Sequence, residues 1–486
     1  MVRQREVTKV SRRSLLRRAA VLVGGATAAI IVTACGETSS PTALAPAGGG
    51  ATAAPKPSMA PSGTPTVVSP TGVQPSSAPA QTGKAKVTLT YTNNSTGSDK
   101  AVQESLITEF AKTNPNIIVN YTPIPADSWG GYFDKVATLI AGGTPPDVSR
   151  IAIEGAQLFA SRDLSLPLDS FISNEPDKLG EYYADVYKPV IDVFVTNGKT
   201  YGLPFAANTE VMFYNKKMFQ DAGVPLPTEM WTKDQFIDAA QKLTKRSGSG
   251  DPQVYGFGFP IAYFNGAIPF IFSNGSNLLT DDLTKSQAND PKVVEAITLM
   301  RDMVWDLKVA PKPTTNGNDI VNLFAARKIA MMPGARNPIG ALKAAGLSTD
   351  EYDIAPWPSW KANVTEFGVG ASAILKSSKY PQEAWQWVKF LTSPTAIAFL
   401  TLTGGSVPAR RSVANSDAMF KDAPANSKIF YALLEKGSKA VPAPKQYSRV
   451  EESLLRNLGQ IYANETPPDK GMDVVHKELT TILAAP

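Results

Sequence analysis

From residue 87 onward the sequence alternates short apolar runs with amphipathic stretches, and this alternation leaves few folds open to it. Runs at 87–91, 117–121 and 147–153 have the β-branched and aromatic composition of strands. The stretches at 98–110 and 132–140 carry apolar residues at helical spacing. This β-α-β-α-β order predicts an α/β fold with a mostly parallel sheet and helices on both faces.

Ligands of such sheets collect at the carboxyl ends of the strands. Here these ends are polar, and three of them carry side chains suited to ligand binding: Asn93 and Ser95, then Trp129, then Glu154. Each residue could equally belong to an ordinary solvated loop. Three polar loops at one edge of a sheet nevertheless favour a binding site.

A second informative stretch runs from 198 to 219. A turn at Asn197-Gly198 precedes an apolar run at 201–205, a polar gap at 208–210, and a second apolar run at 211–214. A small polar gap between two apolar strands suits a chain that leaves one packed body and enters another.

Further along the chain, several elements can be expected from local patterns. Thr232 and Gln235 form a capping box that places Trp231 against Phe236, so Trp231 is interpreted as structural. A strand is expected at 255–259, and Asp290-Pro291 starts a helix that extends to about 307.

These segments resemble the family 1 extracellular solute-binding proteins of ABC importers. The resemblance rests on "YGLPF" at 201–205 followed by "FYNKKMF" at 213–219, on "FAARKIAMM" at 324–332, where Arg327 replaces the usual Gly, and on "SVPARR" at 406–411. It covers roughly residues 86–486 and implies a periplasmic-binding-protein type II fold, with two doubly wound α/β lobes joined by a hinge of several segments. The implied lobes are 86–206 with 370–412, and 207–369 with 413–486.

The first 34 residues have the pattern of an export signal. A basic segment with Arg12-Arg13 precedes an apolar run of small residues that ends at Cys35. The segment 32–35, "VTAC", resembles a lipobox, which predicts that Cys35 carries lipid and holds the protein at the extracytoplasmic face of the cell membrane. The run is too short and too rich in Gly and Ala to span a membrane.

The formal net charge of +5 comes from this leader, which holds seven Lys or Arg and one acidic residue. The remainder of the chain stands at −1. We therefore expect no nucleic-acid partner. The segment 35–85 is almost wholly Pro, Ala, Ser, Thr and Gly, and it is interpreted as a disordered tether with a reach on the order of 40 Å.

Few catalytic classes fit the sequence. It has one His and one Cys, no P-loop and no G-x-S-x-G elbow, so we expect neither a catalytic residue, a metal site nor a cofactor. An enzyme that uses two carboxylates, a secreted glycosidase or lyase with Glu154 and Glu210, stays open as an alternative, as does a binding protein for a solute other than a sugar.

The resemblance implies a monomer that captures a mono- or oligosaccharide between its lobes and delivers it to the permease subunits of an ABC transporter. Sugars need aromatic faces for stacking and polar groups for the rim of hydroxyls. The residues nominated for this role are Asn93, Ser95, Trp129, Glu154, Asn208, Tyr263, Asn265, Asn274, Arg336, Trp357 and Tyr447.

Overall fold

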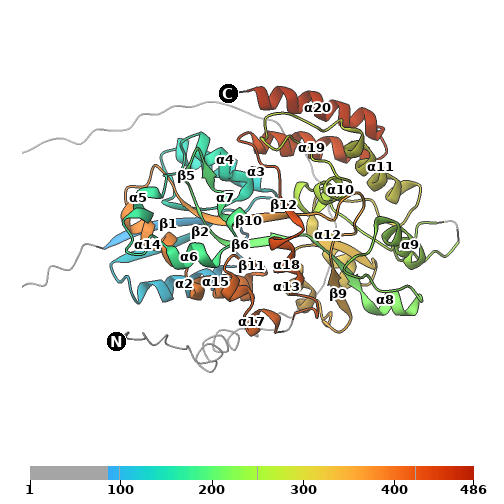
Figure 1. Cartoon of the computed structure of the whole chain (residues 1–486), viewed down its shortest axis with the longest axis horizontal. Coiled ribbons are helices and arrows are strands. Elements are labelled where there is room, and N and C mark those ends of the chain that lie inside the picture. The colour runs from blue at the N-terminus through green and yellow to red at the C-terminus, as the bar shows by residue number, and fades with distance from the viewer. Residues whose placement is uncertain (1–85, 98, 249, 422, 486) are drawn as a thin grey trace, which may run out of the picture. The chain divides into compact units, whose positions relative to one another are not determined.

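The computed structural model describes residues 86–97, 99–248, 250–421 and 423–485, which fall within one compact unit of the chain (Figure 1). The predicted export signal at 1–34, the predicted lipid site at Cys35 and the tether at 35–85 lie outside the described residues.

A larger sheet has the strand order β11-β6-β10-β3-β1-β2, and β12 pairs beside β10. β1 pairs in parallel with β2 and β3, whereas β10 runs antiparallel to β3 and β6. The three strands predicted at the start of the folded part are confirmed, with ends shifted by one or two residues. The strands of this sheet are β1 (Val87–Asn93), β2 (Ile117–Pro123), β3 (Val148–Ala152), β6 (Leu203–Thr209), β10 (Thr365–Ile374), β11 (Val407–Pro408) and β12 (Ser438–Ala440).

Helices that follow these strands supply the rest of the core around this sheet. The ring of Phe110 in α2 lies 5.0 Å from that of Trp387 in α14, and Tyr91 of β1 meets the same tryptophan at 5.6 Å. The elements of this part are α2 (Lys100–Ala111), α3 (Trp129–Ala141), α4 (Ile153–Ser161), α5 (Asp169–Ser173), α6 (Gly180–Asp185), α7 (Lys188–Asp192), the hairpin of β4 (Val195–Thr196) and β5 (Lys199–Thr200), α14 (Pro381–Leu391) and α15 (Pro394–Gly404).

A smaller sheet has the order β8-β7-β9, with both pairs antiparallel. Its strands are β7 (Val211–Asn215), β8 (Met331–Gly334) and β9 (Tyr352–Ala355). The helices that follow β7 are α8 (Lys216–Asp221), α9 (Lys233–Leu243), the π-helical turn η1 (Tyr263–Ala267), α10 (Ile268–Ser273), α11 (Pro291–Trp305), α12 (Gly317–Ala325) and α13 (Pro338–Ala344). Those of the C-terminal part are α16 (Arg411–Ala414), α17 (Asp417–Phe420), α18 (Ile429–Glu435), α19 (Tyr447–Tyr462) and α20 (Pro468–Ala484).

The predicted capping box begins α9 and is confirmed. The Thr232 hydroxyl accepts the N–H of Gln235, whose side chain accepts the N–H of Thr232. The rings of Trp231 and Phe236 meet edge to face at 5.8 Å, so Trp231 is structural as expected. The helix predicted from Pro291 is also confirmed, as α11.

The strand predicted at 255–259 is wrong. The segment bends at Gly256, and its backbone donors bind separate segments: Tyr255 donates to the carbonyl of Lys328, and Phe257 donates to that of Val309. No continuous partner strand runs beside it among the described residues. The apolar pattern therefore reflects burial between several elements.

The chain passes from the larger sheet to the smaller one at Glu210, between β6 and β7. There the Glu210 N–H donates to the carbonyl of Glu366 at 3.1 Å, and the Thr365 hydroxyl donates to the carbonyl of Glu210 at 3.0 Å. Thr365 in turn donates its N–H to the carbonyl of Gly437, just before β12. Three chain segments thus lie side by side at this crossing, where Figure 1 places β6, β10 and β12 together. The lobe boundaries given above stay a prediction.

Candidate functional site

Five buried polar side chains gather where α4, η1, β10 and α19 approach one another. We call them the Tyr263 cluster: Glu154, Tyr263, Glu366, Tyr447 and Glu451, each at most 7% exposed. Burial raises the pKa of Tyr263 well above its ordinary value of 10, and the negative fields of all three glutamates act in the same direction. The three carboxyl groups therefore lie close enough to act on one hydroxyl.

The two tyrosines form the aromatic part of the cluster. Their rings meet edge to face with centroids 5.2 Å apart. The Tyr263 hydroxyl donates to the carbonyl of Pro442 at 2.7 Å, and the Tyr447 hydroxyl donates to Oε1 of Glu451 at 2.9 Å. The other oxygen of Glu451 accepts the N–H of Gly130 at 3.3 Å, which ties α19 to the start of α3. These groups are held by the protein itself.

Glu154 differs from Glu451 in having an oxygen without a partner. It stands in the first turn of α4, directly after β3, and is 3% exposed. Its Oε2 is buried and accepts no hydrogen bond from the described residues. Burial, with the field of Glu451 added, raises the pKa of Glu154 to about 8. Glu154 therefore lies directly after the end of a strand, the position at which the sequence predicted a ligand group.

A second pair of carboxyls lies at the crossing between the sheets. Glu366 accepts the N–H of Asn265 at 2.6 Å through one oxygen, while its other oxygen has no partner among the described residues. Glu210 is fully buried, and neither of its carboxyl oxygens has a partner there. Burial raises the pKa of both groups well above their ordinary range, and the field of Glu366 adds to the effect on Glu210.

Two asparagines extend this set of unpartnered acceptors. Asn208 lies in β6 beside the crossing, and Asn265 holds a left-handed backbone with φ of 65° in η1. The side-chain oxygen of each is buried and has no partner among the described residues. Buried polar groups are nearly always hydrogen-bonded in folded proteins, and leaving one unpaired costs roughly 1–3 kcal/mol. Such a collection of free acceptors is suited to a ligand that donates hydrogen bonds.

Trp129 and Arg150 are half-buried, and their side chains lie against each other. Trp129 begins α3, where Ser128 caps the helix, and its ring stacks on Phe133 at 5.8 Å. The Arg150 guanidinium lies 5.9 Å from the Trp129 ring centroid and 5.0 Å from that of Phe205. Its Nε has no partner among the described residues. An aromatic face and a free donor are both groups that a sugar can use.

The nominated residues at the end of β1 are engaged locally. Asn93 donates to a carboxyl oxygen of Asp99 at 3.0 Å, and the Ser95 hydroxyl also donates to Asp99. Tyr121 of β2 donates to the same carboxylate at 2.8 Å. Of these groups only the Asn93 side-chain oxygen is buried without a partner among the described residues, so Asn93 retains one free acceptor.

Three nominated residues are held in contacts on other elements. Asn274 is fully buried at the end of α10 and donates to the carbonyl of Lys292 at 2.7 Å, which fixes α10 against α11. Arg336 donates to the carbonyl of Thr401 at 2.6 Å. The ring of Trp357 packs edge to face on Phe270 at 5.0 Å. These contacts give each of the three a role in the fold.

Glu210, Glu366, Glu451 and Arg150 are not among the residues nominated from the sequence as ligand residues, and Glu210 was named only for the enzyme alternative. Glu210 lies in the polar gap between two strands, so its position was a usable signal. Glu451 follows Tyr447 by one helical turn, which was a weaker one. Glu366 has no local pattern that distinguishes it from a solvated residue at the start of a strand.

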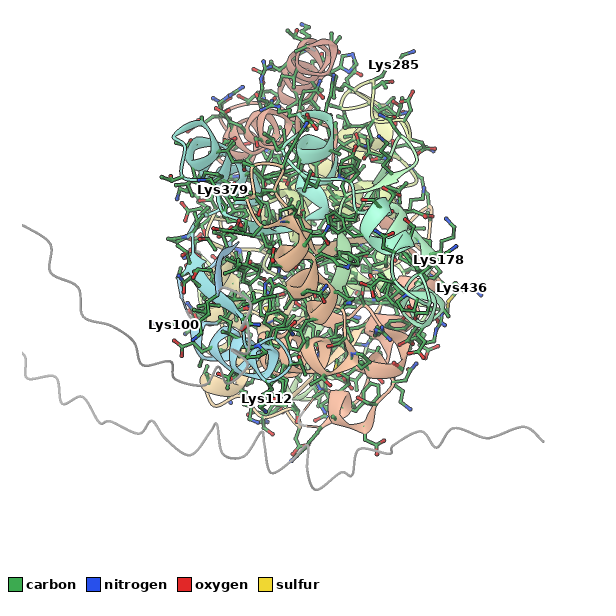
Figure 2. All side chains as sticks on the ribbon, turned by 90° about the vertical axis from the view of Figure 1, so that its left-hand side faces the viewer. Lys100, Lys112, Lys178, Lys285, Lys379 and Lys436 are labelled. Carbon is green, nitrogen blue, oxygen red and sulfur yellow. The ribbon has the colours of Figure 1, made fainter. Side chains whose placement is uncertain are left out.

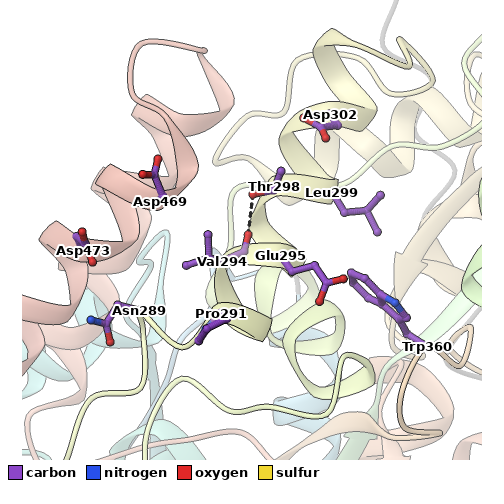
Figure 3. A pocket seen from close by; sticks show the side chains of 10 residues that line it. All are labelled: Asn289, Pro291, Val294, Glu295, Thr298, Leu299, Asp302, Trp360, Asp469 and Asp473. Atoms are coloured by element: carbon purple, nitrogen blue, oxygen red, sulfur yellow. Dashed lines mark hydrogen bonds between the residues drawn. The ribbon is translucent and has the colours of Figure 1, made fainter.

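An open groove of about 570 Å³ lies elsewhere, between α11 and α20 (Figure 3). Four acidic side chains line it, together with Trp360. Three of these acids have a basic partner, since Glu295 pairs with Lys361 at 2.5 Å, Asp302 with Arg301 at 2.9 Å and Asp469 with Lys470 at 3.4 Å. The groove is lined by Asn289, Pro291, Val294, Glu295, Thr298, Leu299, Asp302, Trp360, Asp469 and Asp473. Its exposed, partly paired acids differ from the buried free oxygens of the Tyr263 cluster.

Several lysines lie at the surface of the molecule (Figure 2), whereas the glutamates described above are buried. The lysines labelled in Figure 2, among them Lys100 of α2 and Lys112 just after that helix, project from the outside of the molecule. Within the described part of the chain, no group of three or more His, Cys, Asp or Glu side chains is arranged to hold a metal ion. The helices described here include none that is long and apolar enough to cross a membrane.

The sequence of this chain matches a known family and several known proteins. The profile of the family described as "Bacterial extracellular solute-binding protein" matches residues 92–398. A putative binding protein of Brucella abortus is 27% identical over 396 residues, which cover 80% of this chain and 91% of the relative. The maltotriose-binding protein of Pyrococcus abyssi is 25% identical, over 71% of this chain and 70% of its own.

Solved structures agree on the fold. An ABC substrate-binding protein of Listeria monocytogenes, in complex with cycloalternan, superposes with a TM-score of 0.72 at 24% identity, covering 82% of this chain and 98% of its own. A receptor of Streptomyces glaucescens, solved unliganded and with acarbose, gives 0.70 at 23% identity, covering 82% of this chain and 99% of its own. The predicted periplasmic-binding-protein type II fold is confirmed. The chain belongs to the bacterial extracellular solute-binding protein family.

Proposed function

We propose that this protein is the sugar-binding component of an ABC importer, held at the outer face of the cell membrane and free of catalytic activity. Several relatives are sugar-binding proteins by name, among them the maltotriose-binding protein and a multiple sugar-binding protein of Streptococcus mutans. The observation that carries the proposal is the set of buried, unpartnered acceptors in and around the Tyr263 cluster.

A saccharide matches this set chemically. Its hydroxyls donate hydrogen bonds, so they would satisfy the free oxygens of Glu154, Asn208 and Asn265 and remove the penalty of burying them unpaired. The half-buried face of Trp129 offers a surface for the apolar side of a pyranose ring. Of the nominated residues, these four are the ones whose surroundings support ligand contact most directly.

The proposed binding motion is closure of two lobes, 86–206 with 370–412 and 207–369 with 413–486. The crossing at Glu210 supports it, because the chain passes there from the larger sheet to the smaller one, beside the start of β10 and the segment before β12. A few extended segments between two packed bodies can absorb a hinge rotation. Opening of the lobes would give a ligand access to the acceptors beside the crossing, which are buried in this structure.

The proposed anchor is a lipid on Cys35, followed by a tether to residue 85. Such an arrangement would let the folded body reach the permease subunits while staying at the membrane. Its support lies in the sequence: the small-residue lipobox pattern before a single cysteine.

A thermal-shift screen of the full-length protein against mono- and oligosaccharides tests the proposed ligand class. A sugar that binds the folded state raises the melting temperature, by an amount that grows with concentration over Kd. The proposal expects at least one neutral or charged sugar to do so, with no hydrolysis products after prolonged incubation. If amino acids, peptides or polyamines shift the melting temperature and no sugar does, the ligand class is wrong; hydrolysis of the sugar would show an enzyme.

A further inference from the structure

The charge of the candidate site is unusual for a neutral ligand. Four glutamates are at least nine-tenths buried there: Glu154, Glu210, Glu366 and Glu451. Each of three glutamates raises the pKa of a neighbour. The field of Glu366 raises the pKa of Glu210, that of Glu154 raises the pKa of Glu366, and that of Glu451 raises the pKa of Glu154. The carboxyls therefore form one electrostatic group that spans α4, the crossing and α19.

No lysine or arginine in the described part of the chain forms an ion pair with any of the four. The guanidinium of Arg150 stacks on Trp129 and Phe205 instead. Buried charges in folded proteins are normally paired, because removing an ion from water without a partner is costly. Without such a partner the carboxyls keep their protons, as the raised pKa of Glu154 indicates, and a cationic ligand would supply the partner that allows them to ionise.

Unpartnered hydrogen-bond acceptors are also concentrated in this site. Four carboxyl oxygens are buried without a partner: Oε2 of Glu154, Oε2 of Glu366 and both oxygens of Glu210. The free side-chain oxygens of Asn208 and Asn265 add two more acceptors. A hydroxyl brings one donor, whereas an ammonium brings three donors. An ammonium can therefore donate to several of these oxygens at once.

We infer that the ligand is a basic sugar, a saccharide that carries at least one protonated amine, and that this amine binds among the carboxyls of Glu154, Glu210 and Glu366. A metal ion is a poorer match, because the described acidic side chains form no group of three arranged to hold one. This inference rests on the proposed function, since it specifies the kind of sugar that the same site takes.

Matched pairs of sugars test the inference. Each pair differs only in an amine for a hydroxyl: glucosamine with glucose, galactosamine with galactose, mannosamine with mannose, and the β-1,4 dimer of glucosamine with cellobiose. Calorimetric titration of the full-length protein near pH 7 should show at least tenfold tighter binding of the amine in one or more pairs. The N-acetylated form of that amino sugar should lose the advantage, because acetylation removes the charge and keeps the ring.

Variants locate the effect. Glu154→Gln and Glu366→Gln keep the size of the side chain but remove its ability to ionise beside an ammonium, so each should reduce the preference for the amine at least tenfold. Affinity for the neutral sugar of the pair should change less. Glu104→Gln on α2 is the matched control, since Glu104 is 61% exposed and pairs only with Lys100. Circular dichroism and the melting temperature of each variant show whether it is folded, and folded glutamine variants that keep the wild-type preference would overturn the placement.

The outcomes separate this inference from the proposed function. If neutral sugars bind as tightly as their amines or more tightly, the inference is wrong while the sugar-binding proposal stands. If no sugar of either kind binds, both are wrong. An amine preference that survives both glutamine substitutions would also overturn the assignment to these carboxyls.

Discussion

The N–H of Glu210 donates to the carbonyl oxygen of Glu366, 3.1 Å away, at the point where the chain passes from the larger sheet to the smaller one. The two residues are thereby joined through their backbones while both side chains are fully buried with free carboxyl oxygens. A carboxyl pair in this position links the proposed hinge to the proposed ligand site.

Glu154→Gln should change how stability depends on pH. The pKa of Glu154 is raised from 4.5 to about 8 in the folded protein, so between these values the folded state keeps a proton that the unfolded state has lost. Stability therefore falls as pH rises through this window, by up to about 1.4 kcal/mol per pH unit from this group. Urea unfolding of the ligand-free protein from pH 5 to pH 8 should show a shallower decline in the variant.

Glu104→Gln is the control for that experiment, and it should leave the wild-type curve unchanged. Parallel curves for wild type and Glu154→Gln would mean that this carboxyl titrates normally and is not held in a buried, uncompensated site.

Asn274→Ala should affect the fold and not the binding of sugar. Its side chain joins α10 to α11 through hydrogen bonds to the carbonyl of Lys292 and to Glu295. We expect a loss of about 1–3 kcal/mol of unfolding free energy, because the partners are left unpaired. Sugar affinity below the melting transition should stay within twofold of wild type. A tenfold loss of affinity in a folded variant would return Asn274 to the ligand site.

The anchor gives a prediction independent of the folded part. Cys35→Ala should move the protein from the membrane fraction to the soluble extracytoplasmic fraction, because the proposed lipid is its only hold on the bilayer in this account. Metabolic labelling with a fatty acid should mark wild type and not the variant. An alanine variant that stays in the membrane fraction, as the wild type does, would contradict the lipoprotein assignment.

Closure around the ligand should be visible in solution. Small-angle scattering with a confirmed sugar should give a smaller radius of gyration than the ligand-free protein, because the proposed lobes rotate about the crossing at Glu210. The same titration with a sugar that does not bind is the control. An unchanged radius at saturating ligand would exclude the closing motion.

The sequence predicted the fold better than the site, for physical reasons. Strand and helix periods are local, so the β-α-β-α-β pattern and the capping box at Thr232 could be recognised directly. Glu154 could be nominated because the end of a parallel strand is a general ligand position. The strand prediction for 255–259 failed because burial among several elements produces the same apolar pattern as a strand.

The partners of Glu154 could not be predicted in this way. The carboxyls of Glu366 and Glu451 both raise the pKa of Tyr263 although the two residues are 85 positions apart, and the packing of α19 against η1 and α4 brings them into one region. Asn274 and Trp357 were nominated from the segments in which they lie. Their direction depends on the tertiary contacts with Lys292 and Phe270, which no local pattern encodes.

The most direct measurement is calorimetric titration of wild type, Asn208→Ala and Glu154→Gln with the best sugar from the thermal-shift screen. Asn208 is half-buried, and glutamine keeps the shape of Glu154, so the ligand-free melting temperatures should stay almost unchanged. Each variant loses a contact worth about 1–3 kcal/mol, so affinity should fall roughly tenfold or more in both. Wild-type affinity in both folded variants would contradict a sugar site at the Tyr263 cluster.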